Sequence, residues 1–387
     1  MDPSRRSRLR DELRLDAGRL ASLVERHGTP LLVLQPHRVA RRYRELTAAL
    51  PGFRLHYAVK AQPHPLVLST IGICGGGFDV ASRVEVDLLQ QLGMPMDRAI
   101  YTNPIKKAAD IDHAYSAGIR TFVVENSCET EKFVGCADDV ELLVRLAFRN
   151  PAAKSDLSSK FGVEPADAEL LVKHSIAAGA RFAGFSFHVG SQSASAQPYR
   201  EALQGTLDLI GHIEETLGIS SRVIDIGGGF PVSYREWLPG IGEIGDIVDD
   251  VLGDAGHEFT LLAEPGRFLA ADCMTLLTSV VGSAVRDGQL WHYLDDGLYG
   301  SYSNVMTEDV HPPILALREL DGSNEEAAYE PVTLAGPTCD SADVIVRDYP
   351  MPPLAVGDIV ASPMMGAYTS VTSSRFNGIA ATPIVMS

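Results

Sequence analysis

One lysine in this chain ends a run of residues that otherwise predicts a buried strand. The run is Tyr57-Ala58-Val59-Lys60. Burial disfavours the charged ammonium form, so a lysine there is either paired with an acid or poised as an amine that can form a Schiff base with a carbonyl. The alternative is that Lys60 only extends from the strand end into water. The other residues that could share a site with it decide between these interpretations.

Other chemically capable residues also follow apolar runs. They are Asp79, Arg145, His188, Ser191, Gly227, Gly228, Gly229, Glu264, Gly266 and Arg267. Taken singly, such residues have ordinary explanations: glycines form tight turns, an arginine forms ion pairs and a buried histidine is satisfied by its neighbours. Taken together they suit a phosphorylated heteroaromatic cofactor, because glycine N–H groups and an arginine bind phosphate and a flat imidazole can stack on a ring.

The elements that must position these residues alternate along the chain. Strand candidates are the apolar runs Arg54–Ala61, Phe78–Ala81, Ala99–Thr102, Thr121–Val124, Glu141–Phe148, Phe182–Val189, Arg222–Ile226 and Thr260–Ala263. Helical patterns occupy most intervals, at Pro65–Ile71, Val84–Leu92, Lys106–Ala117, Glu129–Ala137, Pro165–Ala178, Pro198–Leu217 and Ile244–Gly253. This alternation predicts a (β/α)8 TIM-like barrel, in which active sites lie at the carboxyl ends of the strands. An open doubly wound sheet is the alternative, but no GxGxxG turn follows the first strand.

The pattern changes after Gly266. Apolar runs without regular helices between them follow at Met274–Val281, Leu290–Leu294, Pro331–Ala335, Asp358–Ala361 and Ile379–Val385. Such spacing predicts an all-β domain, a β-sandwich or β-barrel, which the early strand candidate Thr29–Leu34 can join. We therefore expect a barrel over residues 36–268 and a discontinuous β domain made of residues 1–35 and 269–387.

Composition limits the classes of partner and compartment. The 387 residues include 50 acidic and 33 basic ones, a net charge of -17, which disfavours nucleic acid and anionic membranes as partners. The five cysteines are scattered without a CxxC pair, so we expect reduced thiols in a cytoplasm and no metal site. An amphipathic helix is expected over Asp11–His27, and no signal-peptide core or apolar run of membrane-spanning length is present.

The sequence resembles a known family, the fold-type III pyridoxal-phosphate decarboxylases of basic amino acids, and most closely the bacterial ornithine/lysine decarboxylases. The matching motifs occur in family order over residues 55–378. Besides Tyr57-Ala58-Val59-Lys60, they are Phe187-His188-Val189-Gly190-Ser191, Asp225-Ile226-Gly227-Gly228-Gly229-Phe230-Pro231, Glu264-Pro265-Gly266-Arg267, Asp296-Gly297-Leu298-Tyr299-Gly300, Gly336-Pro337-Thr338-Cys339-Asp340 and Gly366-Ala367-Tyr368-Thr369.

The resemblance implies a role for each cofactor residue. Lys60 holds pyridoxal 5'-phosphate as an internal aldimine, and Glu264 keeps the pyridine nitrogen protonated so that the ring accepts electrons through a quinonoid intermediate. A racemase of this fold has an arginine at that nitrogen instead, so Glu264 favours decarboxylation. His188 stacks on the ring, while Asp79 and Arg145 support Lys60 and Glu264. The phosphate is held by Ser191, Gly228, Gly229, Gly266, Arg267 and Tyr368.

The resemblance also implies a homodimer with shared active sites. In the family, the residues matching Cys339 and Asp340 cross the subunit interface into the partner's site. Cys339 resembles the residue that protonates the substrate α-carbon, and Asp340 suits a distal ammonium group on the substrate. An unpaired cysteine would otherwise be interpreted as a small buried hydrophobe. Tyr299 and Tyr368 are expected to line the same substrate site.

Substrate choice is where this sequence departs from the family pattern. Ornithine decarboxylases have an aspartate where counting from Asp296 places Glu308, next to Asp309. The longer side chain moves the carboxylate into the pocket, which favours a shorter or displaced substrate; alternatively, Glu308 faces solvent and Asp309 takes its role. The Cys339-Asp340 pair favours ornithine or lysine over diaminopimelate, whose decarboxylases usually have a glutamate after the cysteine. We therefore expect decarboxylation of ornithine or lysine to the diamine, as in polyamine biosynthesis.

Two other functions stay open. One is a specialised biosynthetic decarboxylase that acts on diaminopimelate, a shorter diamino acid or a conjugated amino acid with a cationic end. The other is a catalytically inactive homologue that binds a regulatory protein. Such homologues typically lose cofactor residues, whereas Lys60, Glu264, Arg267, Cys339 and Tyr368 are all present.

Overall fold

The computed structural model describes residues 15–151, 153–320 and 328–387, and these form two compact units. The barrel unit comprises Val39–Val232 and Leu238–Leu269. Of the described residues, the β-sheet unit comprises 15–38, Ser233–Trp237, 270–320 and 328–387. Each unit is described separately below.

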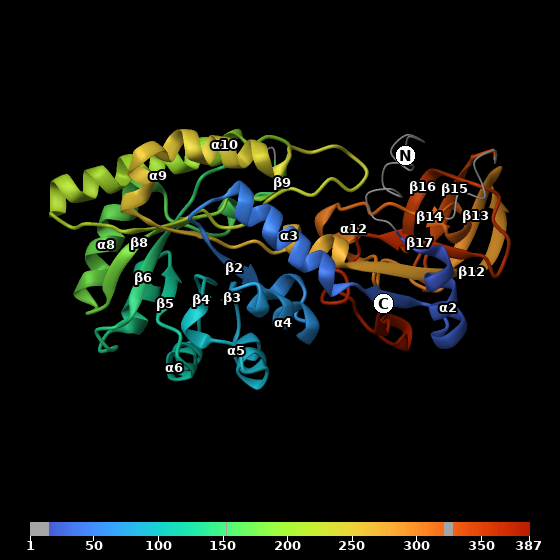
Figure 1. Cartoon of the computed structure of the whole chain (residues 1–387), viewed down its shortest axis with the longest axis horizontal. Helices are drawn as coiled ribbons and strands as arrows, with labels where there is room; N and C mark the ends of the chain where they lie inside the picture. The colour runs from blue at the N-terminus through green and yellow to red at the C-terminus, as the bar shows by residue number, and fades with distance from the viewer. Residues whose placement is uncertain (1–14, 152, 321–327) are drawn as a thin grey trace. The chain divides into compact units, whose positions relative to one another are not determined.

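The barrel unit contains a closed barrel of parallel strands in the order β10-β11-β2-β3-β4-β5-β6-β8 (Figure 1). The strands are β2 (Arg54–Ala58), β3 (Gly77–Val80), β4 (Ala99–Tyr101), β5 (Thr121–Val124), β6 (Glu141–Leu146), β8 (Arg181–Phe187), β10 (Val223–Asp225) and β11 (Thr260–Ala263). Each overlaps one of the predicted runs, with ends that differ by at most three residues, so the expected (β/α)8 barrel is confirmed. Closure brings the first and last strands together, because Ala263 of β11 pairs with Leu55 of β2.

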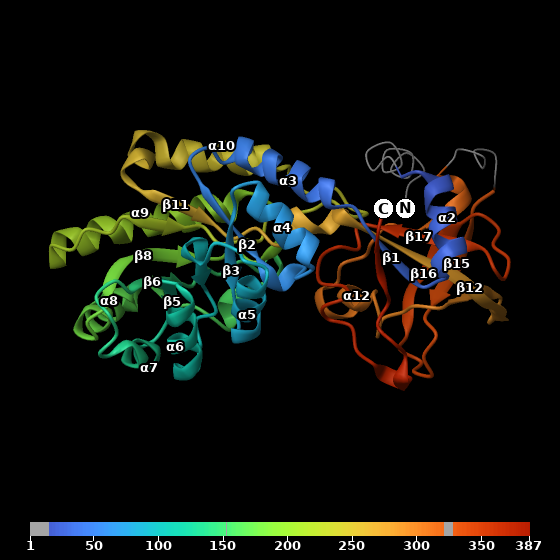
Figure 2. The same ribbon diagram turned by 60° about the horizontal axis from the view of Figure 1, so that its bottom comes forward.

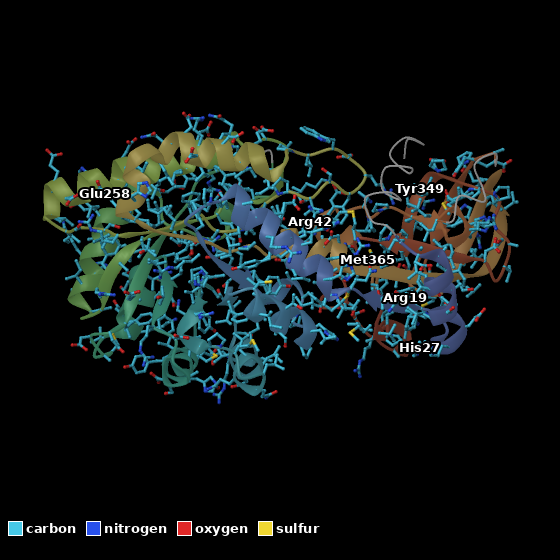
Figure 3. All side chains as sticks on the ribbon, in the orientation of Figure 1. Arg19, His27, Arg42, Glu258, Tyr349 and Met365 are labelled. Carbon is cyan, nitrogen blue, oxygen red and sulfur yellow. The ribbon has the colours of Figure 1, made fainter. Side chains whose placement is uncertain are left out.

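Helices surround this barrel, as the two views in Figure 1 and Figure 2 show. They are α3 (Pro36–Ala49), α4 (Pro65–Ile73), α5 (Arg83–Gln91), α6 (Ala108–Ala117), α7 (Ser127–Thr130), α8 (Ala168–Ala177), α9 (Gln197–Leu217) and α10 (Ile241–Leu252). Local sequence sets several ends: Ser82 caps α5 by accepting from the Glu85 N–H, and Gly118 ends α6 at a positive φ of 111°. Arg42, labelled in Figure 3, extends from α3 over the ring of Phe268 at 5.3 Å.

Small and branched apolar side chains from neighbouring strands fill the barrel interior. Val123, Leu143, Ala183 and Leu262 form one buried cluster, with Val223 packed against it. A filled interior of this kind is a packed core and not a channel, so polar chemistry is confined to the ends of the strands.

The β-sheet unit is built around one eight-stranded mixed sheet. Its strands are β1 (Leu31–Leu34), β12 (Met274–Arg286), β13 (Gln289–Leu294), β14 (Leu315–Ala316), β15 (Glu330–Ala335), β16 (Val344–Met351), β17 (Ile359–Pro363) and β18 (Ile384–Met386). β1 pairs antiparallel with β12 and parallel with β18, so the early strand joins the late ones as predicted. Tyr349 of β16 is labelled in Figure 3. Its hydroxyl donates to the Ile314 carbonyl at 3.0 Å and accepts from the Ile314 N–H at 3.1 Å, which holds β16 against the segment before β14.

Several helices differ from the sequence prediction. α3 was not expected, and the helix expected over Glu129–Ala137 is α7 followed by the short 3-10 turn η3 (Glu131–Phe133). After Gly266, where we expected no regular helices, the chain forms α11 (Arg267–Ala270) and α12 (Ser303–Glu308). The helix expected over Asp11–His27 is α2 (Ala17–His27), and residues 11–14 lie outside the described residues. No helix in the described ranges combines the length and the apolarity that crossing a membrane requires.

Candidate active site

Lys60 lies just beyond the carboxyl end of β2, in the 3-10 turn η1 (Val59–Ala61). Its Nζ donates to Asp79 Oδ2 at 2.5 Å, and the other carboxylate oxygen of Asp79 accepts from the Thr102 hydroxyl. Parallel pairing of β2 with β3 makes this contact possible, because it places Ala58 directly opposite Asp79. Asp79 is fully buried, whereas 42% of the Lys60 side chain is exposed. The lysine is therefore held by an acid and still open to a ligand.

Glu85 stands close to this pair, and the sequence analysis did not find it. Its Oε2 accepts from the Ala81 N–H at 2.6 Å, and its own N–H donates to Ser82. Burial raises the pKa of Glu85 to about 7, Asp79 raises it further and Lys60 opposes the rise. The available signal was the capping box Ser82-x-x-Glu85 immediately after the strand that carries Asp79.

Arg145 lies near the end of β6 among several acids. Burial lowers the pKa of its guanidinium, and Glu264, Glu125, Asp79 and Asp225 counteract this effect in decreasing order. Its guanidinium also lies 5.3 Å from the centre of the Phe161 ring. The cation therefore compensates a group of carboxyls that would otherwise repel one another.

Glu264 and Asp225 are neighbouring carboxyls at the ends of β11 and β10. Burial raises the pKa of Glu264 well above its usual value, and Asp225 and Asp79 add to the effect. Burial likewise raises the pKa of Asp225 to about 6, against the hydrogen bond that its Oδ1 accepts from the Gly227 N–H at 2.9 Å. Two acids this close favour a shared proton or a nearby cation.

His188 follows β8 and has a defined tautomer. Its Nδ1 accepts from the Gly190 N–H at 3.0 Å, so the neutral ring carries its proton on Nε2. Burial lowers the pKa of His188 to about 3, and Arg145 and Lys60 contribute to the shift. At neutral pH the imidazole is therefore an uncharged flat ring that can stack on another ring.

The three glycines after β10 form a turn that no larger residue fits. Gly227 and Gly229 have positive φ angles of 66° and 89°. A Cβ on Gly228 would lie 2.5 Å from the Glu264 carbonyl oxygen, and one on Gly229 would lie 2.0 Å from that of Gly190. Within the described part of the chain, the N–H groups of Gly228 and Gly229 donate no hydrogen bond, so both remain available to an oxyanion.

The remaining predicted cofactor residues of the barrel unit lie on adjoining segments. Arg267 is 5% exposed and is the first residue of α11, and the carbonyl of Gly266 accepts from Leu269 at 3.2 Å. Ser191 begins the short strand β9 (Ser191–Ser193), which pairs antiparallel with β7 (Ala153–Ser155). The structure thus collects the lysine, the acids, the imidazole and the glycine turn at the carboxyl ends of the barrel strands.

The β-sheet unit gathers a second group of predicted residues. The Tyr299 hydroxyl donates to Asp340 Oδ2, and the Tyr299 ring lies 4.6 Å from the ring of Phe376. The Ala342 N–H and the Tyr299 hydroxyl lower the pKa of Asp340. The exposed thiol of Cys339 contacts Asn377, a residue that the sequence analysis did not consider.

Glu308 and Tyr368 also lie in the β-sheet unit. Glu308 is the last residue of α12 and is partly buried, whereas its neighbour Asp309 is exposed and pairs with His311 at 2.8 Å. Tyr368 has a positive φ of 53°, and its carbonyl accepts from the Thr372 hydroxyl at 2.8 Å. The burial difference favours Glu308 over Asp309 as the residue that faces a ligand.

Comparison with known proteins identifies the family. Residues 37–271 match the family model for the pyridoxal-dependent decarboxylases, pyridoxal binding domain. The chain belongs to the pyridoxal-dependent decarboxylases. This family match covers the whole barrel and so includes every cofactor residue predicted in the barrel unit.

Several relatives of this chain are named as decarboxylases of basic amino acids. The lysine/ornithine decarboxylase of Selenomonas ruminantium is 35% identical over 374 residues, covering 96% of this chain and 93% of that protein. A crystal structure of the lysine/ornithine decarboxylase from Vibrio vulnificus, complexed with putrescine, has a TM-score of 0.88 and 39% identity over 96% of this chain and 98% of that one. The agmatine-bound arginine decarboxylase of Paramecium bursaria Chlorella virus has a TM-score of 0.89 and 28% identity, covering 96% and 100% of the two chains.

The barrel residues of this decarboxylase fit pyridoxal phosphate. The turn at Gly228 and Gly229 excludes any Cβ and leaves N–H groups suited to a phosphate. Asp79, Asp225 and Glu264 outnumber the neighbouring cations Lys60 and Arg145, so the cluster gains stability from one more positive charge. The protonated ring nitrogen of a bound pyridoxal phosphate would supply such a charge.

Proposed function

We propose that this enzyme decarboxylates ornithine or lysine to the corresponding diamine with pyridoxal phosphate bound through Lys60. The observation that carries the proposal is the Lys60 amine, held 2.5 Å from a buried aspartate at the carboxyl end of the barrel and still 42% exposed. Membership of the pyridoxal-dependent decarboxylases and the 35% identity to a lysine/ornithine decarboxylase support it.

Each barrel residue contributes a defined part of the chemistry. Pyridoxal phosphate supplies a ring that accepts the electron pair left when the carboxylate departs as CO2. Glu264 would hold a proton at the ring nitrogen, and Arg145 compensates the charge of Glu264 and Asp79. His188, a neutral imidazole, would cover the ring. Lys60 would hold the aldehyde group of the cofactor.

The phosphate end is fixed by groups that carry no role in bond breaking. Gly228 and Gly229 offer backbone N–H groups, Arg267 offers a buried guanidinium, and Ser191 and Tyr368 offer hydroxyls. With the phosphate held there, His188 and Glu264 would be the groups that hold the ring. None of the phosphate-binding groups would need to change its charge during the reaction.

Substrate choice follows from the carboxylates of the β-sheet unit. Asp340 has a lowered pKa and is therefore ionised at neutral pH, which suits the distal ammonium of ornithine or lysine. Tyr299 fixes Asp340 through its hydroxyl. Glu308 supplies a second carboxylate, and its extra methylene relative to the family aspartate shortens the pocket and favours the shorter of two homologous substrates.

The proposal includes assembly as a homodimer in which Cys339 and Asp340 complete the partner's site. The cysteine is exposed in the single chain, as a residue that acts in another subunit must be. We place the enzyme in the cytoplasm, since its five cysteines include no CxxC pair and are free thiols. Its diamine product places it among the reactions of polyamine biosynthesis.

A substrate screen tests the proposal. Purified holoenzyme is given ornithine, lysine, arginine, diaminopimelate or 2,4-diaminobutyrate, and released CO2 and amine are measured. We expect ornithine or lysine to give the highest kcat/KM, and Glu308→Asp to raise the preference for lysine over ornithine. If only diaminopimelate or 2,4-diaminobutyrate is turned over, that amino acid is the substrate and the proposed preference for ornithine or lysine is wrong. If none of the amino acids is turned over, the proposed activity is contradicted. Asp309→Asn is the matched control and should leave the preference unchanged.

A further inference from the structure

Three segments of the β-sheet unit are joined by hydrogen bonds around Cys339. The Tyr299 hydroxyl donates to Asp340, the residue after the cysteine. The Ser374 N–H donates to the Tyr299 carbonyl at 2.8 Å. The Cys339 N–H donates to Asn377 Oδ1 at 3.2 Å, so each segment is hydrogen-bonded to the other two. The thiol therefore stands where three loops hold each other in place.

Both polar atoms of the Asn377 carboxamide contact the sulfur of Cys339. The thiol donates to Oδ1 at 3.4 Å, and Nδ2 donates to Sγ at 3.3 Å. A carboxamide has one acceptor and one donor side by side, whereas a hydroxyl or a carboxylate offers a different balance. The S–H form needs the acceptor and the thiolate needs the donor. The same side chain therefore serves the sulfur in both protonation states.

The backbone of Asn377 is set for this contact. Its φ and ψ are 56° and 14°, inside the short 3-10 segment η9 (Phe376–Gly378). Asparagine tolerates this left-handed conformation better than other residues with a Cβ. The preceding residue, Phe376, places its ring 4.6 Å from that of Tyr299. The segment that carries the carboxamide is thus held in place, and the contact with Cys339 follows.

The other ionisable groups near the sulfur are acids and a phenol. Asp340 follows Cys339 in the chain, and the hydrogen bond to Asp340 raises the pKa of Tyr299. Asp343 and Cys339 raise that pKa further, so both lie close to the phenol. Ionised carboxylates such as Asp340 and Asp343 can only accept hydrogen bonds. The Asn377 carboxamide instead offers the sulfur a neutral donor.

We propose that Asn377 is a positioning residue that orients the Cys339 thiol and stabilises its thiolate during turnover. The proposal rests on the proposed decarboxylation with Cys339 as proton donor. In that step the S–H bond breaks, a C–H bond forms at the carbon that lost CO2, and the sulfur keeps the electron pair. The thiolate then recovers a proton from solvent, and Oδ1 of Asn377 again accepts from the thiol.

The test compares Asn377→Asp with Asn377→Gly in the holoenzyme. The aspartate keeps the acceptor oxygen and replaces the donor by negative charge, while the glycine keeps the left-handed backbone and removes both contacts. Alkylation of Cys339 by iodoacetamide is followed across pH by peptide mass spectrometry, with the exposed Cys128 as internal reference. The ratio of amine to aldehyde product from ornithine or lysine is measured in parallel.

We expect Asn377→Asp to move the midpoint of the alkylation curve upward by about one pH unit, which is about tenfold slower alkylation below the midpoint. Both variants should divert turnover toward the aldehyde, which forms when the proton goes to the cofactor carbon instead, water hydrolyses the imine and the amino group stays on the cofactor as its pyridoxamine form. Asn377→Gly should shift the curve less. Before substrate is added, the visible absorbance of the bound cofactor should be the same as in the wild type. Asp348→Gly, at another exposed left-handed position with φ 50°, is the matched control and should change neither measurement.

The outcomes separate this proposal from the proposed function. If wild-type enzyme releases CO2 and both variants keep its alkylation curve and product ratio, Asn377 has no positioning role and the decarboxylase assignment stands. Loss of turnover with an unchanged alkylation curve would mark a purely structural residue and also overturn the proposal. If no basic amino acid is turned over, the role of Asn377 in turnover falls with the proposed function, even when the curve shifts.

Discussion

At the scale of single residues, the protonation state of Glu85 links stability to pH. Its pKa in the folded chain is about 7, against 4.5 for an ordinary glutamate, because the side chain is buried. The folded chain therefore binds more protons than the unfolded chain between these two values. Folding stability attributable to Glu85 is fully present below pH 4.5 and falls as pH rises toward 7.

Replacing Glu85 by glutamine should remove this dependence. The amide oxygen of the new side chain can still accept from the Ala81 N–H, so the helix cap is retained. Urea unfolding of the apoprotein measures the fall in unfolding free energy between about pH 5 and about pH 8. We expect this fall to be about 1–3 kcal/mol smaller in Glu85→Gln than in the wild type.

The exposed Glu243, in the first turn of α10, controls for the change in charge: Glu243→Gln should keep the wild-type dependence. If the unfolding free energy depends on pH equally in Glu85→Gln and in the wild type, ionisation of Glu85 does not destabilise the folded chain, and the prediction is wrong.

Residue identities alone predicted much of the site, but the contacts between distant residues were not predictable in the same way. Lys60 and Asp79 were predicted together, and the structure places them in contact. Asp225 was noted only as part of a motif, because nothing in a sequence shows that its carboxyl lies beside that of Glu264 on the neighbouring strand. Asn377 was missed for the same reason: its partner Cys339 lies 38 positions away, and no local pattern joins them.

At the scale of elements, the glycine turn after β10 allows one conformation and excludes side chains. Gly229→Ala would place a Cβ 2.0 Å from the Gly190 carbonyl oxygen at a φ of 89°. We expect a loss of about 2–4 kcal/mol in unfolding free energy and at least about tenfold weaker binding of pyridoxal phosphate. Urea unfolding and fluorescence titration with the cofactor measure these two effects.

Gly211→Ala is the matched control for this turn. Gly211 lies inside α9 with nothing within 4 Å of an added Cβ, so alanine should be neutral or slightly stabilising there. A Gly229→Ala chain with wild-type stability and cofactor affinity would show that the turn relaxes freely and that its N–H groups do not hold the phosphate.

Elements with a clear period were predictable, and short or highly charged ones were not. The barrel strands are continuous apolar runs, so each was found. α3 was missed because its sequence, Pro36–Ala49, is dominated by charged and polar residues that hide the apolar positions Val39 and Leu46. β16 contains Asp348 and Pro350, which argue against a strand, and α12 is only six residues long.

At the scale of the whole molecule, the proposed homodimer makes the activity of two defective chains recoverable. A Lys60→Ala chain lacks the cofactor lysine, and a Cys339→Ala chain lacks the proton donor. If sites are shared, each mixed dimer contains one intact site. Equal mixing should restore about a quarter of the wild-type rate, since half of the dimers are mixed and half of their sites are intact.

Native mass spectrometry shows whether mixed dimers have formed, and CO2 release reports the activity. Mixed dimers that recover no activity would argue against sites built from two chains. The predicted domain boundaries, residues 36–268 for the barrel and 1–35 with 269–387 for the β domain, stay a prediction until each part is produced separately.

The identity of the lysine that carries the cofactor is the central claim, and Lys106 is its physical rival. Burial lowers the pKa of Lys106 to about 8, which by itself favours a reactive amine. However, its Nζ donates to the carbonyls of Asn103, Pro104 and Val123 at 3.1, 3.2 and 2.6 Å, and its side chain is fully buried. The Lys60 side chain, by contrast, is 42% exposed.

Borohydride reduction of the holoenzyme followed by peptide mass spectrometry locates the cofactor directly. We predict a pyridoxyl group on Lys60 in the wild-type chain, with loss of the label and of visible absorbance in Lys60→Ala. A label on Lys106, or a label that survives in Lys60→Ala, would contradict the account.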